Sequence, residues 1–197
     1  MMRSATLTNV LLVRPGATDF DAQGRMKGCL DMPLSEAGVA QANALAEELN
    51  QLRVRTVFSA PCESARETAR RIADRQRAAG YDAKVKVIEG FRNLDHGLWH
   101  GKLVDEVKRN HPRVYRMGSD HPEEFCPPEG EPVSAAKTRA IKALKKCLKK
   151  GRDDLVALVI PEPLASIVES LLRDTELNSL WKHETDTACW SMIETEL

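Results

Sequence analysis

The sequence predicts an α/β domain, a three-layer sandwich in which helices cover both faces of a mostly parallel sheet. Short, continuous apolar runs typical of buried parallel strands recur along the chain, and stretches with helical spacing separate them. Strands that alternate with helices in this way build parallel sheets. The chain has 197 residues, enough for one domain with a sizeable core and few for two, so we expect a single domain over residues 1–197.

The first expected strand is Val10–Val13, a wholly apolar run that ends just before Pro15 and a glycine. A loop follows. Ser35 is then a suitable N-cap for a helix to Leu49, because alanines and leucines recur there at roughly helical spacing. The loop therefore begins at the carboxyl end of a strand, where ligands bind in sheets of this type.

The later elements follow from the same patterns, apolar runs for strands and helix formers with an apolar stripe for helices. The expected strands are Thr56–Ser59, Val85–Ile88 and Leu155–Ile160, with Ala188–Ile193 as an edge strand. The expected helices are Cys62–Ala78, Val133–Leu148 and Leu164–Leu172. Proline, glycine and acidic residues are dense between Gly118 and Pro132, so we expect a surface insertion or lid over about residues 100–132.

Composition argues against several classes of partner and cofactor. The formal net charge is zero, so no global field draws the protein to nucleic acid or to an anionic membrane. The five cysteines are scattered without a C-x-x-C pair, and His111, His121 and His183 are isolated, with no partner at metal-ligand spacing. We therefore expect no metal, no cofactor, no nucleic acid and no membrane partner. The apolar run at Val10 is too short for a signal segment, which favours the cytoplasm.

Several motifs occur in a specific order. They are LLVRPGATDFDAQGRMKG from Leu11, PLSEAG from Pro33, SAP from Ser59, FRNLDHGLWHG from Phe91, PPEGEP from Pro127 and LVALVIPE from Leu155. Together they resemble the histidine phosphatase superfamily, the phosphoglycerate-mutase-like proteins, from residue 10 to about residue 167. The resemblance implies the same α/β fold.

The resemblance also implies that the catalytic groups are missing. The family's nucleophilic histidine, in an Arg-His-Gly motif, falls on Pro15 beside Arg14, and proline offers neither a nucleophile nor a backbone donor. The second histidine falls on Pro161. The family's arginine falls on Ser64, which cannot make a bidentate contact with phosphate, and its acid falls on Asn93, which cannot donate a proton. We expect the two prolines side by side at the rim of one pocket, with Arg14 and Ser64.

Few residues of the implied pocket could still bind a ligand. The family's pocket asparagine is Asp21 here, and only Arg14 and Arg25 remain basic. Arg14 is interpreted first as a structural arginine paired with Asp21 or Glu162, and second as an anion ligand. His96 is expected near the pocket mouth. The candidate ligand-binding residues are thus Arg14, Asp21, Arg25 and His96.

Three functions stay open at this point. The first is a catalytically inactive member of the family that serves as a binding or regulatory domain for a small molecule or a protein. The second is an active phosphomonoester hydrolase whose nucleophile has moved to His96, Cys62 or another group. The third is a protein-interaction module whose old pocket is closed by proline, and a homodimer is compatible with all three.

Overall fold

The computed structural model describes residues 8–150, 155–183 and 186–195. Its centre is a five-stranded sheet in the order β3-β2-β4-β1-β5. The strands are β1 (Thr8–Val13), β2 (Thr56–Ser59), β3 (Lys84–Val87), β4 (Val156–Val159) and β5 (Trp190–Thr195). All neighbouring pairs are parallel except β1 with β5, which is antiparallel. The α/β fold class with a mostly parallel sheet is confirmed.

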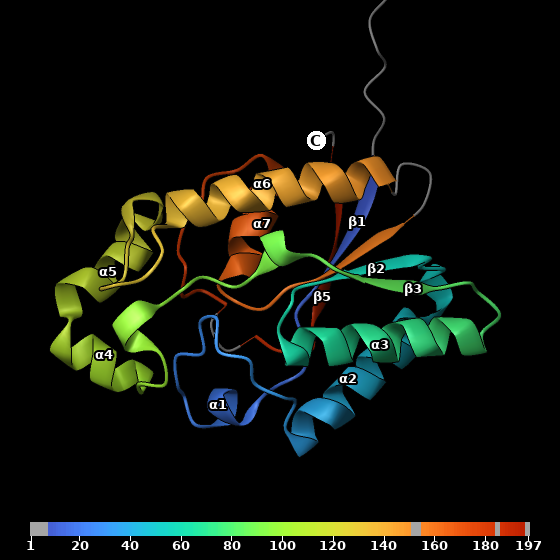
Figure 1. The fold of residues 1–197 in the computed structure, drawn as a ribbon, viewed down its shortest axis with the longest axis horizontal. Coiled ribbons are helices and arrows are strands. Elements are labelled where there is room, and N and C mark those ends of the chain that lie inside the picture. Colours follow the sequence, from blue (N-terminus) through green and yellow to red (C-terminus); the bar gives the residue numbers. More distant parts are fainter. Residues whose placement is uncertain (1–7, 151–154, 184–185, 196–197) are drawn as a thin grey trace, which may run out of the picture.

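Helices cover both faces of this sheet. Figure 1 shows α2 and α3 on one face, α6 and α7 on the other, and α4 and α5 beyond one end of the sheet. The α-helices are α1 (Asp19–Ala22), α2 (Glu36–Glu48), α3 (Glu63–Ala78), α4 (Val104–Asn110), α5 (Pro112–Asp120), α6 (Val133–Lys150) and α7 (Leu164–Arg173). Single 3-10 turns are η1 (Leu49–Leu52), η2 (Glu89–Phe91), η3 (Gly97–Trp99) and η4 (Pro122–Glu124). Among the described residues, no helix is long and apolar enough to cross a bilayer.

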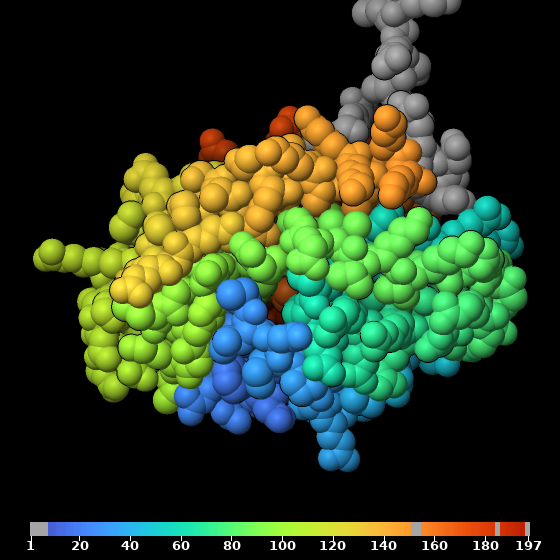
Figure 2. Space-filling view, in the orientation of Figure 1, coloured from blue at the N-terminus to red at the C-terminus, as the bar shows by residue number. Residues whose placement is uncertain are grey.

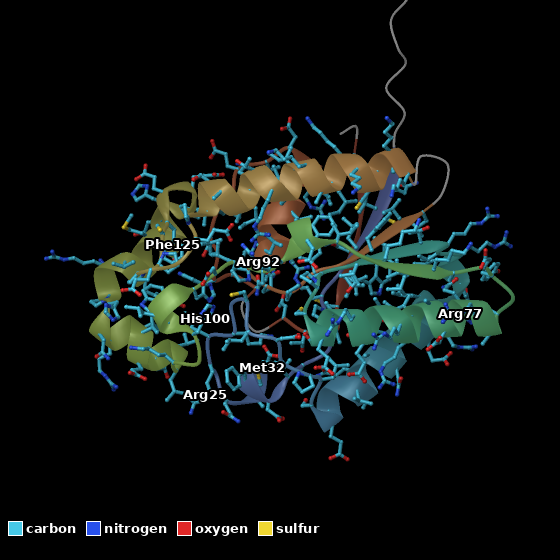
Figure 3. The ribbon with its side chains drawn as sticks, viewed as in Figure 1. Arg25, Met32, Arg77, Arg92, His100 and Phe125 are labelled. Atoms are coloured by element: carbon cyan, nitrogen blue, oxygen red, sulfur yellow. The ribbon has the colours of Figure 1, made fainter. Side chains whose placement is uncertain are left out.

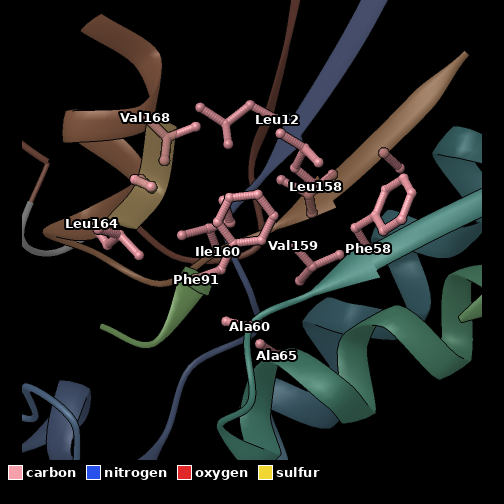
Figure 4. Packing of buried hydrophobic residues seen from close by; sticks show 14 of the residues in the cluster. Leu12, Phe58, Ala60, Ala65, Phe91, Leu158, Val159, Ile160, Leu164 and Val168 are labelled. Carbon is pink, nitrogen blue, oxygen red and sulfur yellow. The ribbon is translucent and has the colours of Figure 1, made fainter. Parts of the chain in front are cut away.

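The central strands are apolar on both sides because helices cover both faces. Every residue of β4 is buried, as are Val10 to Val13 of β1, which explains their unbroken apolar runs. Figure 4 shows Phe91, at the end of η2, lying over Ile160 just beyond β4. Both side chains are fully buried. The core thus continues up to the sheet edge where the loops begin.

The register of the strands brings three loops to that edge. Val13 of β1 and Ser59 of β2 both pair with Val159 of β4. The ladder continues one step further, because the amides of Ile160 and Ala60 donate to Val13 and Val159 at 2.9 Å. The residues that follow β1, β2 and β4 therefore meet at the carboxyl end of the sheet, the place where such folds bind ligands.

The segment expected as a lid over residues 100–132 contains α4, α5 and η4, which the sequence patterns did not indicate. The two α-helices are only 7 and 9 residues long, too short to be stable alone. They depend on an aromatic cluster, here called the aromatic cap: Trp99, His111, Tyr115, Phe125 and Trp181. Tertiary packing, not local propensity, makes this segment helical.

Candidate functional site

Pro15 and Pro161 lie at corresponding places after neighbouring strands. Each is two residues beyond Val13 or Val159, which pair with one another, so the two prolines are side by side as expected. Both are buried. The carbonyl of Pro15 also accepts a hydrogen bond from the amide of Ala188 at 2.8 Å. The prolines therefore belong to the packed end of the sheet, and neither of them lines the small cavity described below.

Arg14 is a structural arginine held by two carboxylates. Its Nε donates to Oε1 of Glu162 at 2.6 Å, and its Nη2 donates to Oε2 of Glu169 at 3.1 Å. Burial alone would lower the pKa of Arg14, but the charge of Glu162 and the hydrogen bonds to both glutamates outweigh it, so the pKa is raised. The pairing with Glu162 is one of the two that the sequence favours; Asp21 instead pairs with Lys27, 2.5 Å away.

Glu162 is as deeply buried as Arg14, since the side chain of each is only 5% exposed. Burial raises the pKa of its carboxyl group, while Arg14 and Ser166 act to lower it. The amide and hydroxyl of Ser166 both donate to Oε2, at 3.2 and 2.8 Å. With both oxygens bonded, Glu162 occupies the position next to Arg14 that an anionic ligand would need.

Asn93 uses its whole side chain to hold backbone. Its Nδ2 donates to the carbonyls of Gly28 and Glu162 at 2.9 and 2.8 Å. Its Oδ1 accepts from the amides of Leu94 and Leu164 at 2.9 and 3.2 Å. The side chain is buried and fully bonded, so it connects the loops after β1 and β4 and has no donor or acceptor left for a ligand.

Ser64 and Arg66 point in different directions at the start of α3. Ser64 is buried, and its Oγ lies 3.7 Å from Sγ of Cys62. Arg66 instead pairs with the exposed Asp31 at 3.5 Å. Burial raises the pKa of the Cys62 thiol, which disfavours the nucleophilic thiolate.

A small cavity lies beside Glu162 and beneath the aromatic cap. Its volume is about 30 Å³, room for roughly two water molecules. Asp21, Arg25 and His96 line it, whereas Arg14 and Ser64 do not. Three of the four expected ligand-binding residues therefore come together. Figure 2 shows a separate hollow in the surface, between the blue N-terminal loop, the teal start of α3 and the green segment that follows β3.

The charged groups of the cavity are already engaged. Nη1 of Arg25 donates to the carbonyl of Gly101 at 2.6 Å, and its Nε donates to Gln23 at 2.8 Å. Asp21 accepts from the amide and hydroxyl of Thr18 at 2.7 and 2.8 Å, besides its ion pair with Lys27. The sequence reasoning did not identify Lys27 as a residue that lines the cavity and pairs with Asp21.

Contrary to the expectation that His96 lies near the pocket mouth, its side chain is buried, with 3% of the residue's surface exposed. Among the described residues neither ring nitrogen has a hydrogen-bond partner. Burial, reinforced by the nearby His100, lowers the pKa of His96 to about 3. Its imidazole is therefore neutral at physiological pH. The ring of Trp181 covers it, with centroids 6.0 Å apart.

The aromatic cap closes this region from outside. Trp181 stacks on Tyr115 with centroids 4.8 Å apart, and its Nε1 donates to the carbonyl of Tyr115 at 2.9 Å. A side chain on Gly118 would collide with the Trp181 indole. Figure 3 labels Phe125 of the cap and His100 on the side that faces the blue N-terminal loop. The loop containing Trp181 is thus joined tightly to α5.

Three side chains with metal-ligand chemistry meet nearby, a grouping that the sequence reasoning missed. They are Cys29, Asp95 and His100, whose ligand atoms all lie within 4.8 Å of one another. Cys29 and His100 are 71 residues apart in the chain, so no spacing motif could reveal them.

Comparison with known proteins agrees with the fold and with the motifs. The model of the histidine phosphatase superfamily (branch 1) matches residues 10–197, and the chain belongs to this family. The chain is 28% identical over 192 residues to phosphoserine phosphatase 1 of Hydrogenobacter thermophilus, covering 96% of this chain and 88% of that one. It is 23% identical over 183 residues to the adenosylcobalamin/alpha-ribazole phosphatase of Salmonella typhimurium, covering 93% and 88%.

Solved structures share the same architecture. The mycobacterial glucosyl-3-phosphoglycerate phosphatase superposes with a TM-score of 0.80 at 22% identity, covering 95% of this chain and 90% of that one. At this level of identity the likeness concerns the fold. The function must be argued from the site itself.

Proposed function

We propose that this family member does not hydrolyse phosphate esters and serves as a binding or regulatory domain. The observation that carries the proposal is the pair of Arg14 with Glu162. The arginine that follows β1 is 4% exposed, and its donors face Glu162 and Glu169 instead of solvent. A phosphate group would have to displace Glu162 or bind beside its negative charge.

The groups at the sheet edge support the same conclusion. Pro15 and Pro161 have no nucleophilic atom, and the amide of Asn93 is saturated by backbone groups. The cavity volume of about 30 Å³ is far below the roughly 300 to 1,000 Å³ of ordinary small-molecule pockets. We infer that the ancestral frame remains while the reaction has been lost.

The active-hydrolase alternative has weak support from the residues named for it. His96 is unprotonated at neutral pH, as a nucleophile must be, but the aromatic cap buries it. Cys62 has a raised pKa. For the interaction-module alternative, α6 presents five exposed lysines: Lys142, Lys145, Lys146, Lys149 and Lys150. We further propose that the protein is located in the cytoplasm and that its binding partner is a small molecule or a protein.

The first test is a phosphatase assay of the purified protein and of Pro15→His. The panel includes phosphoserine, an alpha-ribazole phosphate and glucosyl-3-phosphoglycerate, the substrates named for the relatives, together with an aryl phosphate. We expect no release of phosphate above the buffer rate from either protein. The histidine in Pro15→His would still lack an anion clamp and a proton donor, and catalytic groups that act as a unit fail together.

A working relative, the phosphoserine phosphatase, serves as the positive control. Robust turnover by the unmodified chain would overturn the proposal. In that case His96→Ala and Cys62→Ser would locate the nucleophile. Turnover gained by Pro15→His alone would overturn the argument from the pair of Arg14 and Glu162, since it would show that Arg14 still binds phosphate.

A further inference from the structure

The cluster of Cys29, Asp95 and His100 has the dimensions of a metal site. Nε2 of His100 lies 3.5 Å from Sγ of Cys29 and 3.6 Å from Oδ1 of Asp95. Zinc bonds of about 2.3 Å to sulfur and 2.0 to 2.2 Å to nitrogen or oxygen place tetrahedral ligand atoms about 3.3 to 3.6 Å apart. The two measured separations match the edges of such a tetrahedron.

The donor set also selects the metal. One thiolate, one imidazole and one carboxylate form a mixed soft and hard set, which zinc accepts readily, whereas magnesium and calcium require oxygen ligands. The carboxylate and thiolate charges would balance the two positive charges of the ion. The side chains of Asp95 and His100 are 41% and 20% exposed, so an ion can enter from solvent and keep a water molecule.

The tautomer of His100 is suited to this role. The backbone amides of Cys29 and His96 point at Nε2 from 3.3 and 3.2 Å. An N–H donor must face a lone pair, so in the neutral ring Nε2 is the unprotonated nitrogen, as a ligand must be. These two hydrogen bonds are long, and a metal bond would replace them.

The backbone around the cluster is fixed before any ion arrives. Gly28 has a φ of 51°, and a Cβ at this position would collide with Nε2 and Cδ2 of His100. Asn93 holds the Gly28 carbonyl at 2.9 Å. The carbonyl of Asp95 accepts from the amide of Glu131, and its Oδ1 accepts from that of Gly97, both at 2.9 Å. Binding would therefore leave most of this backbone in place, but the amides of Cys29 and His96 would have to turn away from Nε2 of His100.

We propose that Cys29, Asp95 and His100 bind a zinc ion, with water as the fourth ligand. The thiol of Cys29 loses its proton to solvent as the sulfur lone pair forms the bond to zinc. The ion would join the loop after β1 to the segment that leads into the aromatic cap.

The test is a titration of chelator-stripped protein with zinc. Competition with a chelating dye measures the affinity and the stoichiometry. Calorimetry in two buffers of different ionisation enthalpy measures the number of protons released. We expect one zinc ion per chain and the release of about one proton. Cobalt in place of zinc should show a sulfur-to-metal charge-transfer band and the intense visible bands of a tetrahedral site. Absence of one-to-one binding, or of the charge-transfer band, would overturn the proposal.

Variants show whether the ion is at this place. Cys29→Ser and His100→Gln should each weaken binding more than about 100-fold, because even residues that only support ligands cost 10- to 100-fold. Cys126→Ser is the matched control, since Cys126 is an exposed cysteine outside the cluster, and it should bind zinc as the unmodified chain does. Circular dichroism establishes that each variant is folded. Equal affinity in Cys29→Ser and Cys126→Ser would refute the assignment.

Discussion

Replacing Glu162 by leucine is expected to destabilise the fold by about 3 kcal/mol, the lower part of the range for breaking a buried ion pair. The variant removes the carboxylate 2.6 Å from Nε of Arg14 and leaves a buried guanidinium only partly neutralised. Glu169 remains 3.1 Å away, which keeps the loss from being larger. Urea unfolding at pH 7 measures the change as a shift in midpoint at constant slope.

Glu169→Leu is the matched control, because it removes the other partner of Arg14 from a side chain that is 23% exposed. We expect it to cost about 1 kcal/mol or less, as exposed pairs do. Arg14→Met combined with Glu162→Leu should recover most of the stability, since an apolar pair leaves no buried charge unpaired. Equal losses in both single variants would show that Glu162 is not the principal partner.

His96→Phe is expected to remove much of the acid sensitivity of the fold. The pKa of His96 falls from 6.5 to about 3 on folding, so the unfolded chain takes up the proton first. The stability that the fold gains from keeping His96 neutral is fully present above about pH 6.5, and it is lost as the pH falls toward 3. At pH 5 the loss amounts to about 2 kcal/mol. Phenylalanine does not titrate and leaves no ring nitrogen without a partner.

The measurement compares the free energy of unfolding of both proteins between pH 7.5 and pH 5. As the pH falls, the free energy of unfolding of the unmodified protein should drop by about 2 kcal/mol relative to that of His96→Phe. His183→Gln is the control. His183 lies outside the aromatic cap and its side chain is 33% exposed, so this variant controls for the loss of a histidine that is not buried. Parallel curves for all three proteins would contradict the burial of His96.

The regular elements could be predicted from the sequence because their signals are local. The helix expected over Cys62–Ala78 is α3, Glu63–Ala78, and the one expected over Leu164–Leu172 is α7, Leu164–Arg173. The short α4 and α5 were missed because they depend on tertiary packing, such as the stacking of Tyr115 of α5 on the distant Trp181. A periodic pattern needs more turns than these helices have.

The site could be predicted only in part, and the reason is again distance along the chain. Motif order sufficed to place Pro15 beside Pro161, because strand register follows from the fold. The motifs also suggested Glu162 as a partner of Arg14. They did not indicate Glu169, which is 155 residues away from Arg14 and belongs to none of the motifs. His96 stands between Asp95 and a glycine, a polar setting that gives no local sign of burial. Its environment is decided by the aromatic cap.

The position of β1 in the sheet has a consequence for how the chain folds during synthesis. The first strand to be made pairs only with β4 and β5, the last two, and the amide of Arg14 donates to the carbonyl of Cys189 at 2.8 Å. A nascent chain must therefore carry the apolar run of β1 without a sheet partner until residues beyond 156 are available. Such long-range pairing slows folding and leaves a strand open to chaperones or aggregation in the meantime.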